Sequence, residues 1–163
     1  MVKHYIYRMD HDTGFAPKVQ GKLCTLSGCK KNTIEIWAKE GSWVIGLGGF
    51  KTGKPGKIIY AMMVAENLPY RQFRKYYPGQ SKYLTPKKAG SNVLISRLFY
   101  YLGDRAIGFP KRLKRIFIGR QGCKCVSEVE KNTLIRILER RYKKPGKIGK
   151  PNNPRRYNKC GVC

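Results

Sequence analysis

Short apolar runs separated by polar loops mark the first part of the chain. Trp43 to Leu47 is apolar and rich in strand-favouring residues, and Ile58 to Ala65 is apolar on both faces, which predicts a central strand. The segment between them, Lys51 to Lys57, is polar, carries three lysines and predicts a hairpin-like loop. Tyr5 to Met9 alternates between apolar and polar positions and predicts a first strand.

Helical patterns lie between and after these strands. Ile34 to Glu40 predicts a short helix ended by Gly41, and Pro69 to Tyr77 predicts a helix that starts with proline. Val126 to Tyr142 predicts a longer helix. Three further short strands are expected, at Val93 to Ser96, Phe99 to Leu102 and Leu113 to Ile118. Short strands with interspersed helices indicate a small α+β domain of barrel-like form.

Positive charge dominates the polar positions. The chain has 35 Lys and Arg against 9 Asp and Glu, a formal net charge of +26, and residues 111–163 alone hold 17 cations and 3 anions. Arg140 to Lys159 combines nine cations with five Gly or Pro and no acid, which predicts a flexible basic tail. Self-repulsion of this size is relieved by a polyanion, with DNA or RNA the first candidate and an anionic membrane surface the second.

The apolar runs are too short for a membrane span. No run reaches the roughly 18 to 20 apolar residues that a span needs, and Met1 to Tyr5 lacks the apolar core of a signal peptide, so we expect a cytoplasmic protein without a membrane partner. The 163 residues suit one domain with an appendage.

Several segments together resemble a known family, the nucleotide-modification-associated domains of phages and bacteria. They are Asp12 to Pro17, Cys24 to Lys30, Gly41 to Gly49, Ile59 to Met62, Val93 to Ser96 and Tyr100 to Asp104. The order of elements is also similar to the PUA-like barrels, which include the EVE, ASCH and YTH domains. The resemblance, over roughly residues 5–118, implies a small PUA-like β-barrel with peripheral helices at 1–120, a helical segment at 121–142 and a basic tail at 143–163.

The resemblance also implies a pocket for a modified or flipped base. Phe15 would supply a stacking surface, and Thr25 and Ser27 would supply polar groups for the base edge. The alternative is that residues 12–17 form a turn held by an aspartate and that residues 25–27 cap a loop. The chain differs from the family pattern at Ser42, at Lys18 and in its basic, cysteine-containing tail, which weakens any transfer of base specificity. The candidate nucleic-acid-binding residues of the domain are Asp12, Phe15, Lys18, Thr25, Ser27, Lys30, Gly48, Gly49, Lys51 and Arg97.

A dense basic run adds a second kind of contact. Lys111, Arg112, Lys114 and Arg115 place four cations within five residues, which favours contacts to phosphates rather than to bases. Of the two tryptophans, Trp43 lies in an apolar strand and is expected in the core, whereas Trp37 is expected to be partly exposed.

Cysteine spacing suggests a metal site. Cys123 and Cys125 form one close pair, and Cys160 and Cys163 form a second with the Cys-x-x-Cys spacing of a zinc knuckle. Four thiolates would complete a tetrahedral zinc site, although a single residue inside the first pair is atypical. Free thiols are the alternative.

Catalytic signatures are absent from the sequence. His4 and His11 are the available neutral-pH bases, and neither belongs to a recognisable catalytic or metal-binding motif. The leading hypothesis is therefore a reader of modified or flipped bases in DNA or RNA. Its competitors are a nucleotide-modification enzyme that uses Asp12 or Asp104, and a protein that coats nucleic acid without regard to sequence.

Overall fold

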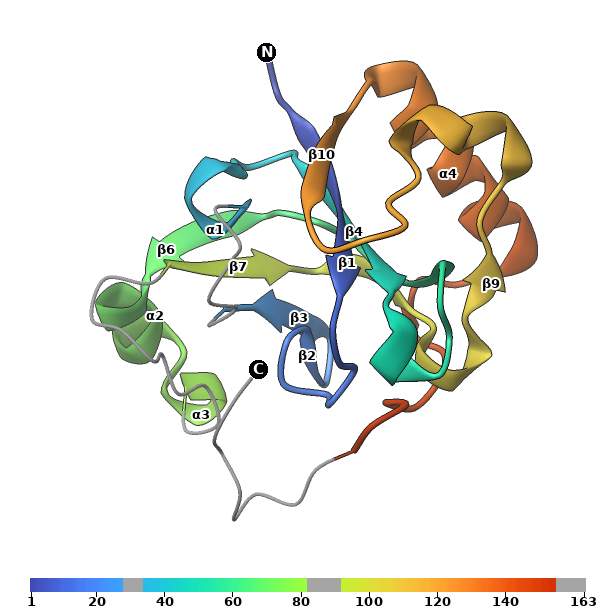
Figure 1. Ribbon diagram of the computed structural model, residues 1–163. Coiled ribbons are helices and arrows are strands. Elements are labelled where there is room, and N and C mark those ends of the chain that lie inside the picture. Colours follow the sequence, from blue (N-terminus) through green and yellow to red (C-terminus); the bar gives the residue numbers. More distant parts are fainter. Residues whose placement is uncertain (28–33, 82–91, 155–163) are drawn as a thin grey trace.

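The structure is a computed structural model that describes residues 1–27, 34–81 and 92–154 (Figure 1). Its strands are β1 His4–Met9, β2 Lys18–Gln20, β3 Leu23–Leu26, β4 Trp43–Gly48, β5 Lys57–Met63, β6 Glu66–Pro69, β7 Asn92–Ser96, β8 Leu98–Tyr101, β9 Ile107–Gly108, β10 Cys123–Val126 and β11 Gly146–Lys147. Its helices are α1 Ile34–Trp37, α2 Tyr70–Tyr76, α3 Pro78–Ser81 and α4 Glu128–Arg141, with 3₁₀ helices η1 Phe50–Thr52, η2 Gly103–Arg105 and η3 Lys111–Ile116. None of the helices in these ranges is long and apolar enough to cross a membrane.

The larger sheet has the strand order β10-β1-β4-β5-β8-β11, with β9 also paired to β5. β1 runs parallel to β4, so the chain crosses the molecule through β2, β3 and α1 before it returns to the same sheet. β5 lies between β4 and β8, and its residues from Ile58 to Met62 are buried, which confirms the predicted central strand.

The smaller sheet has the order β2-β3-β7-β6 and adjoins the larger one where β5 is followed by β6 and β7 by β8 (Figure 1). The pairing passes from Met63 opposite Leu98 in the larger sheet to Glu66 opposite Ile95 in the smaller one. The Ala65 amide donates to the Ile95 carbonyl at 2.7 Å and bridges the bend. The predicted α+β class is confirmed, and the described strands form two sheets joined by the short bends between β5 and β6 and between β7 and β8, without a closed ring of pairings.

Alternate side chains of the larger sheet belong to two different hydrophobic clusters. Tyr5 and Tyr7 join a cluster that also contains Cys24 and Leu94 of the smaller sheet, whereas Ile6 joins a cluster that contains residues of α4. Within the first cluster the hydroxyls of Tyr7 and Tyr60 lie 2.6 Å apart, so each buried phenol has a partner. The second core buries Leu134, Ile135 and Leu138 of α4.

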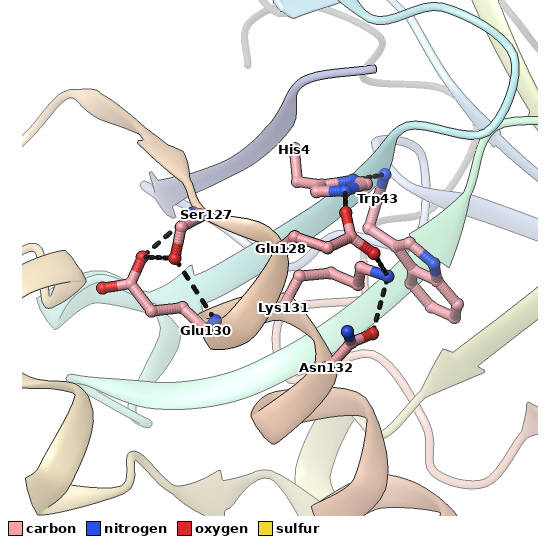
Figure 2. A network of polar contacts seen from close by, with 7 residues as sticks. All are labelled: His4, Trp43, Ser127, Glu128, Glu130, Lys131 and Asn132. Carbon is pink, nitrogen blue, oxygen red and sulfur yellow. Dashed lines mark hydrogen bonds and ion pairs between the residues drawn. The ribbon is translucent and has the colours of Figure 1, made fainter. Parts of the chain in front are cut away.

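Two sets of polar contacts hold the N-terminus of α4, and one of them joins the helix to the sheet (Figure 2). Ser127 caps the helix: its hydroxyl accepts from the Glu130 amide, while the Glu130 carboxylate accepts from the Ser127 amide at 2.9 Å. The Trp43 amide donates to His4 Nδ1 at 3.0 Å, so His4 Nε2 is the donor to Glu128 at 2.6 Å. His4 therefore joins β1, β4 and α4. Trp43 is buried and Trp37 is half exposed, as predicted.

Two segments differ from the sequence-based expectation. The strand predicted at Leu113 to Ile118 is wrong, because residues 111–116 form η3. Leu113 and Ile116 are both buried, and the non-helical backbone of Leu113 (φ −101°, ψ 26°) divides the segment into two short 3₁₀ turns. The flexible tail predicted from residue 143 differs over its first part, where β11 pairs in parallel with β8. Residues 121–153 thus add β10, α4 and β11 to the same structural unit.

Candidate nucleic-acid interface

The loop of residues 50–57 is held in a tight conformation where β4 ends. A Cβ on Gly48 would come within 2.2 Å of the Lys54 carbonyl oxygen, and one on Gly49 within 2.4 Å of the Met9 carbonyl oxygen. The buried Thr52 hydroxyl donates to the Gly49 carbonyl at 2.6 Å and accepts from the Lys54 amide at 3.1 Å. The two glycines therefore serve the close packing of the chain itself, and the loop presents its lysines from a fixed backbone.

An open groove with an aromatic floor lies beside this loop. We call it the 109–117 groove; its volume is about 490 Å³. The rings of Phe109 and Phe117 lie 5.4 Å apart between their centroids, tilted by 55°. Its lining residues are Pro55, Gly56, Phe109, Pro110, Lys111, Lys114 and Phe117. The groove thus combines ring faces with ammonium groups, the pairing that suits bases and phosphates.

The basic run of η3 divides into exposed cations and one paired arginine. Lys111, Arg112 and Lys114 are exposed, and within the described residues they form no ion pair. Arg115 instead contacts Glu130, with 2.7 Å between Nε and Oε1. Three of the four predicted phosphate-binding cations are therefore available for a polyanion, and the fourth binds α4.

The Arg115 contact gives a pH-dependent prediction. The Arg115 guanidinium, together with the Ser127 cap, lowers the pKa of Glu130 to about 2. Because this pKa is below that of the unfolded chain, the stabilisation is complete above about pH 4.5 and is lost as the pH falls towards about 2. We expect Glu130→Gln to lower the melting temperature at neutral pH, with the difference from wild type vanishing near pH 2. A difference that persists unchanged at that pH in thermal melts would contradict this.

A second, smaller groove lies on the other side of the loop. We call it the Phe50 groove; its volume is about 240 Å³. Its residues come from three separate segments and are Arg8, Asp10, Phe50, Lys51, Arg120 and Gln121. Phe50 is 81% exposed, and Gln121 Nε2 donates to Asp10 Oδ2 at 2.8 Å. The predicted cation Lys51 belongs to this groove.

The residues predicted to form a base pocket lie mostly inside the fold. Asp12 is fully buried, and its carboxylate accepts from the Tyr101 hydroxyl and from the Asn152 amide at 2.9 Å. The Thr25 hydroxyl donates to the Lys18 carbonyl at 3.4 Å, and the Ser27 hydroxyl donates to the Asn92 carbonyl at 3.0 Å.

The other predicted contacts are scattered. Lys18 is buried, and burial lowers its pKa to about 8. Phe15 is half-buried, and Lys30 lies outside the described residues. Arg97 bonds Glu66 and the Tyr77 hydroxyl, each at 2.8 Å, so its charge is already compensated.

One of the two predicted cysteine pairs lies within the described residues. Cys123 and Cys125 are exposed on β10, two residues apart and so on one face of the strand. Cys160 and Cys163 lie outside the described residues. No group of three or more metal-binding side chains occurs in the described ranges, and the zinc site stays a prediction.

Sequence reasoning missed several residues of the two grooves. Phe50 and Arg120 follow no periodic pattern, and Phe109 and Phe117 stand eight residues apart in an irregular stretch. The available signal was the placement of aromatic residues next to lysine-rich segments.

One comparison with known proteins, that with family models, shows the family of this chain. The model of the family described as "nucleotide modification associated domain 2" matches residues 1–89, more than half of the chain. Among solved structures, a crystal structure of a point mutant of the ZmASCH protein from Zymomonas mobilis is similar, with 10% identity, a TM-score of 0.45 and coverage of 83% of this chain and 98% of that one. No curated protein matches.

Proposed function

Because the chain belongs to the nucleotide modification associated domain 2 family, we propose that it binds nucleic acid across the face that carries the two grooves. This face consists of the loop of residues 50–57, η3 and the segment of residues 117–121. Phosphates contact its lysines and arginines, and unpaired bases stack on its phenylalanines. Recognition of a modified base is part of the same proposal.

One observation carries the proposal: uncompensated cations border an aromatic floor. Lys111 and Lys114 line the 109–117 groove, and Arg112 is exposed in η3 between them. Leu113 and Ile116 anchor η3 in the core, so the cations project from a rigid base. Binding through charge alone would require only the cations. A nucleic acid offers both phosphates, which contact cations, and base faces, which stack on aromatic rings.

The burial of the Thr25 and Ser27 hydroxyls argues against the base pocket that the family resemblance implies. It favours the two grooves as the place where bases bind. Thr25 and Ser27 are 3% and 7% exposed, and each donates its proton to a backbone carbonyl. Contacts of this kind hold a loop in shape and leave little polar surface for a base edge. The Phe109 and Phe117 rings, in contrast, border open space.

The competing enzyme hypothesis named two carboxylates that have structural partners. Asp12 accepts from Tyr101 and Asn152, and Asp104 Oδ1 accepts from the Lys150 amide at 2.8 Å. Both carboxylates thus hold residues 150–152 against the sheet. We therefore propose binding as the function of this face.

The test is the joint replacement of Lys111, Arg112 and Lys114 by alanine. Binding of labelled single-stranded DNA, duplex DNA and RNA is measured by fluorescence anisotropy at several salt concentrations. We expect weaker binding of every ligand and a slope of log affinity against log salt that falls by about 2 to 3 units, since each lost phosphate contact removes about 0.7 to 0.9.

A matched variant controls for net charge. Arg71, Arg74 and Lys75 are three exposed cations on α2, which lies away from the grooves (Figure 1). Their joint replacement removes the same charge and should change the slope much less. Equal losses in the two triple variants would indicate coating by diffuse charge, and an unchanged slope in the η3 variant would refute the proposed face.

A further inference from the structure

The Phe50 groove places a solvent-facing ring among cations. Phe50 begins η1, and its carbonyl accepts from the Gly53 amide at 3.1 Å, while the preceding Gly49 amide donates to Met9 at 2.8 Å. The turn is therefore anchored to β1 at its base, and the ring stands 81% exposed. An anchored, exposed ring offers a stacking surface at little entropic cost.

Arg8 and Arg120 give this groove its charge. The Arg8 side chain is half-buried, donates to the Gly119 carbonyl, and its Nε lies 3.1 Å from where a Cβ on Gly49 would stand. Arg8 is thus held beneath the groove and supplies a fixed positive field. Lys51 and Arg120 are exposed at its edge and can reach phosphates.

The carboxylate of Asp10 is the unexpected group in this setting. It is exposed, shares the groove with three cations, and accepts from Gln121 Nε2 at 2.8 Å. An ionised carboxylate accepts hydrogen bonds and repels phosphate. A carboxylate kept within a phosphate-binding surface therefore fits a ligand that also brings a hydrogen-bond donor, as the exocyclic amino group of cytosine does.

We propose that the Phe50 groove holds one unpaired nucleobase with an exocyclic amino group, of the cytosine type. The base stacks on Phe50, its amino group donates to Asp10, and the adjoining phosphates contact Lys51 and Arg120. The volume of about 240 Å³ is smaller than the about 300 to 1,000 Å³ of sites for drug-sized ligands, which suits a single base. This inference rests on the proposed nucleic-acid function and adds its base preference.

The experiment compares single-stranded oligo-deoxycytidine with oligo-deoxythymidine of equal length at neutral pH. Thymine is similar in size and carries an acceptor where cytosine carries the amino donor. We expect wild type to bind the cytidine oligomer about five- to tenfold more tightly. Asp10→Asn should bring the ratio close to one without weakening binding of the thymidine oligomer. It removes the charge that repels phosphate and replaces one of the two acceptor oxygens by an amide donor, which suits the acceptor of thymine better than the amino group of cytosine.

The control for Asp10→Asn is a carboxylate just before β4, at the end of that strand far from Phe50. Glu40→Gln removes one exposed carboxylate and should preserve the cytidine preference.

Phe50→Ala should weaken binding of both oligomers about tenfold, and Phe50→Trp should restore binding, since stacking requires only a ring face. Ile36→Ala removes another exposed apolar side chain, 69% exposed, and should have little effect.

The outcomes separate this inference from the proposed function. If wild type binds both oligomers equally, or if Asp10→Asn keeps the preference, the base assignment is overturned while nucleic-acid binding stands. If wild type binds neither these oligomers nor any other nucleic acid, both fall.

Discussion

Replacement of Asp12 by alanine is expected to lower the free energy of unfolding by about 3 to 5 kcal/mol. The Asp12 carboxylate accepts from the Tyr101 hydroxyl, the Asn152 backbone amide and Asn152 Nδ2, the last at 2.8 Å. Asp12 is fully buried and Tyr101 is 1% exposed, so alanine would leave the Tyr101 hydroxyl without this acceptor inside the core and would release both Asn152 donors. Chemical denaturation followed by fluorescence measures the change.

Asp12→Asn is the matched variant for that prediction. An asparagine oxygen can accept from both Asn152 donors, and its amide can donate to the Tyr101 hydroxyl, which then reverses its role. Burial raises the pKa of Tyr101, and the adjacent Asp12 adds to that rise, so the phenol keeps its proton in either arrangement. The loss should be about 1 kcal/mol. Equal losses for alanine and asparagine would contradict a hydrogen-bonding role.

Residues of the larger sheet were predictable because their patterns are local. Val44 to Leu47 and Ile58 to Met62 are continuous apolar runs, and strands buried on both faces produce such runs. The Lys51 to Lys57 loop was predictable from its lysines and its turn-forming glycines and proline. The helix predicted at Val126 to Tyr142 followed from its apolar positions, and the capping box of Ser127 and Glu130 was a further signal that the sequence analysis did not use.

Elements fixed by distant contacts were not predictable. β11 is two residues long, and its segment is held by Tyr101, whose carbonyl accepts from the Ile148 amide at 2.8 Å. In sequence the same segment reads as a basic tail, since proline, glycine and lysine show no periodicity. η3 was predicted as a strand because Leu113 and Ile116 to Ile118 fit either period over so short a stretch.

The residues of the candidate interface also divide into those that local sequence indicated and those that only distant contacts bring together. The cations proposed to contact phosphates, Lys111, Arg112 and Lys114, lie within four residues of sequence, so composition alone indicated them. The Phe50 groove joins residues 8–10, 50–51 and 120–121, which only the pairing of β1 with β4 and β10 brings together. The buried state of Asp12 likewise depends on Asn152, 140 residues away in sequence.

Ending the chain at Tyr142 should destabilise the fold at least as much as Asp12→Ala, whereas ending it at Pro154 should leave the fold intact. The shorter chain loses β11, the Asn152 donors to Asp12 and the Lys150 amide that donates to Asp104. It also loses Gly149, which packs so closely that a Cβ there would lie 1.8 Å from the Leu102 carbonyl oxygen. The longer chain keeps all of these contacts.

The two chain lengths also separate stability from charge. Ending at Pro154 removes Arg155, Arg156 and Lys159, so the salt slope of nucleic-acid binding should fall by about 3 units at most, with an unchanged melting temperature. Ending at Tyr142 should lower the melting temperature, because a buried carboxylate loses its donors and the edge of β8 loses its partner. If the two chains melt at the same temperature, residues 143–154 do not stabilise the fold and act only through their charge.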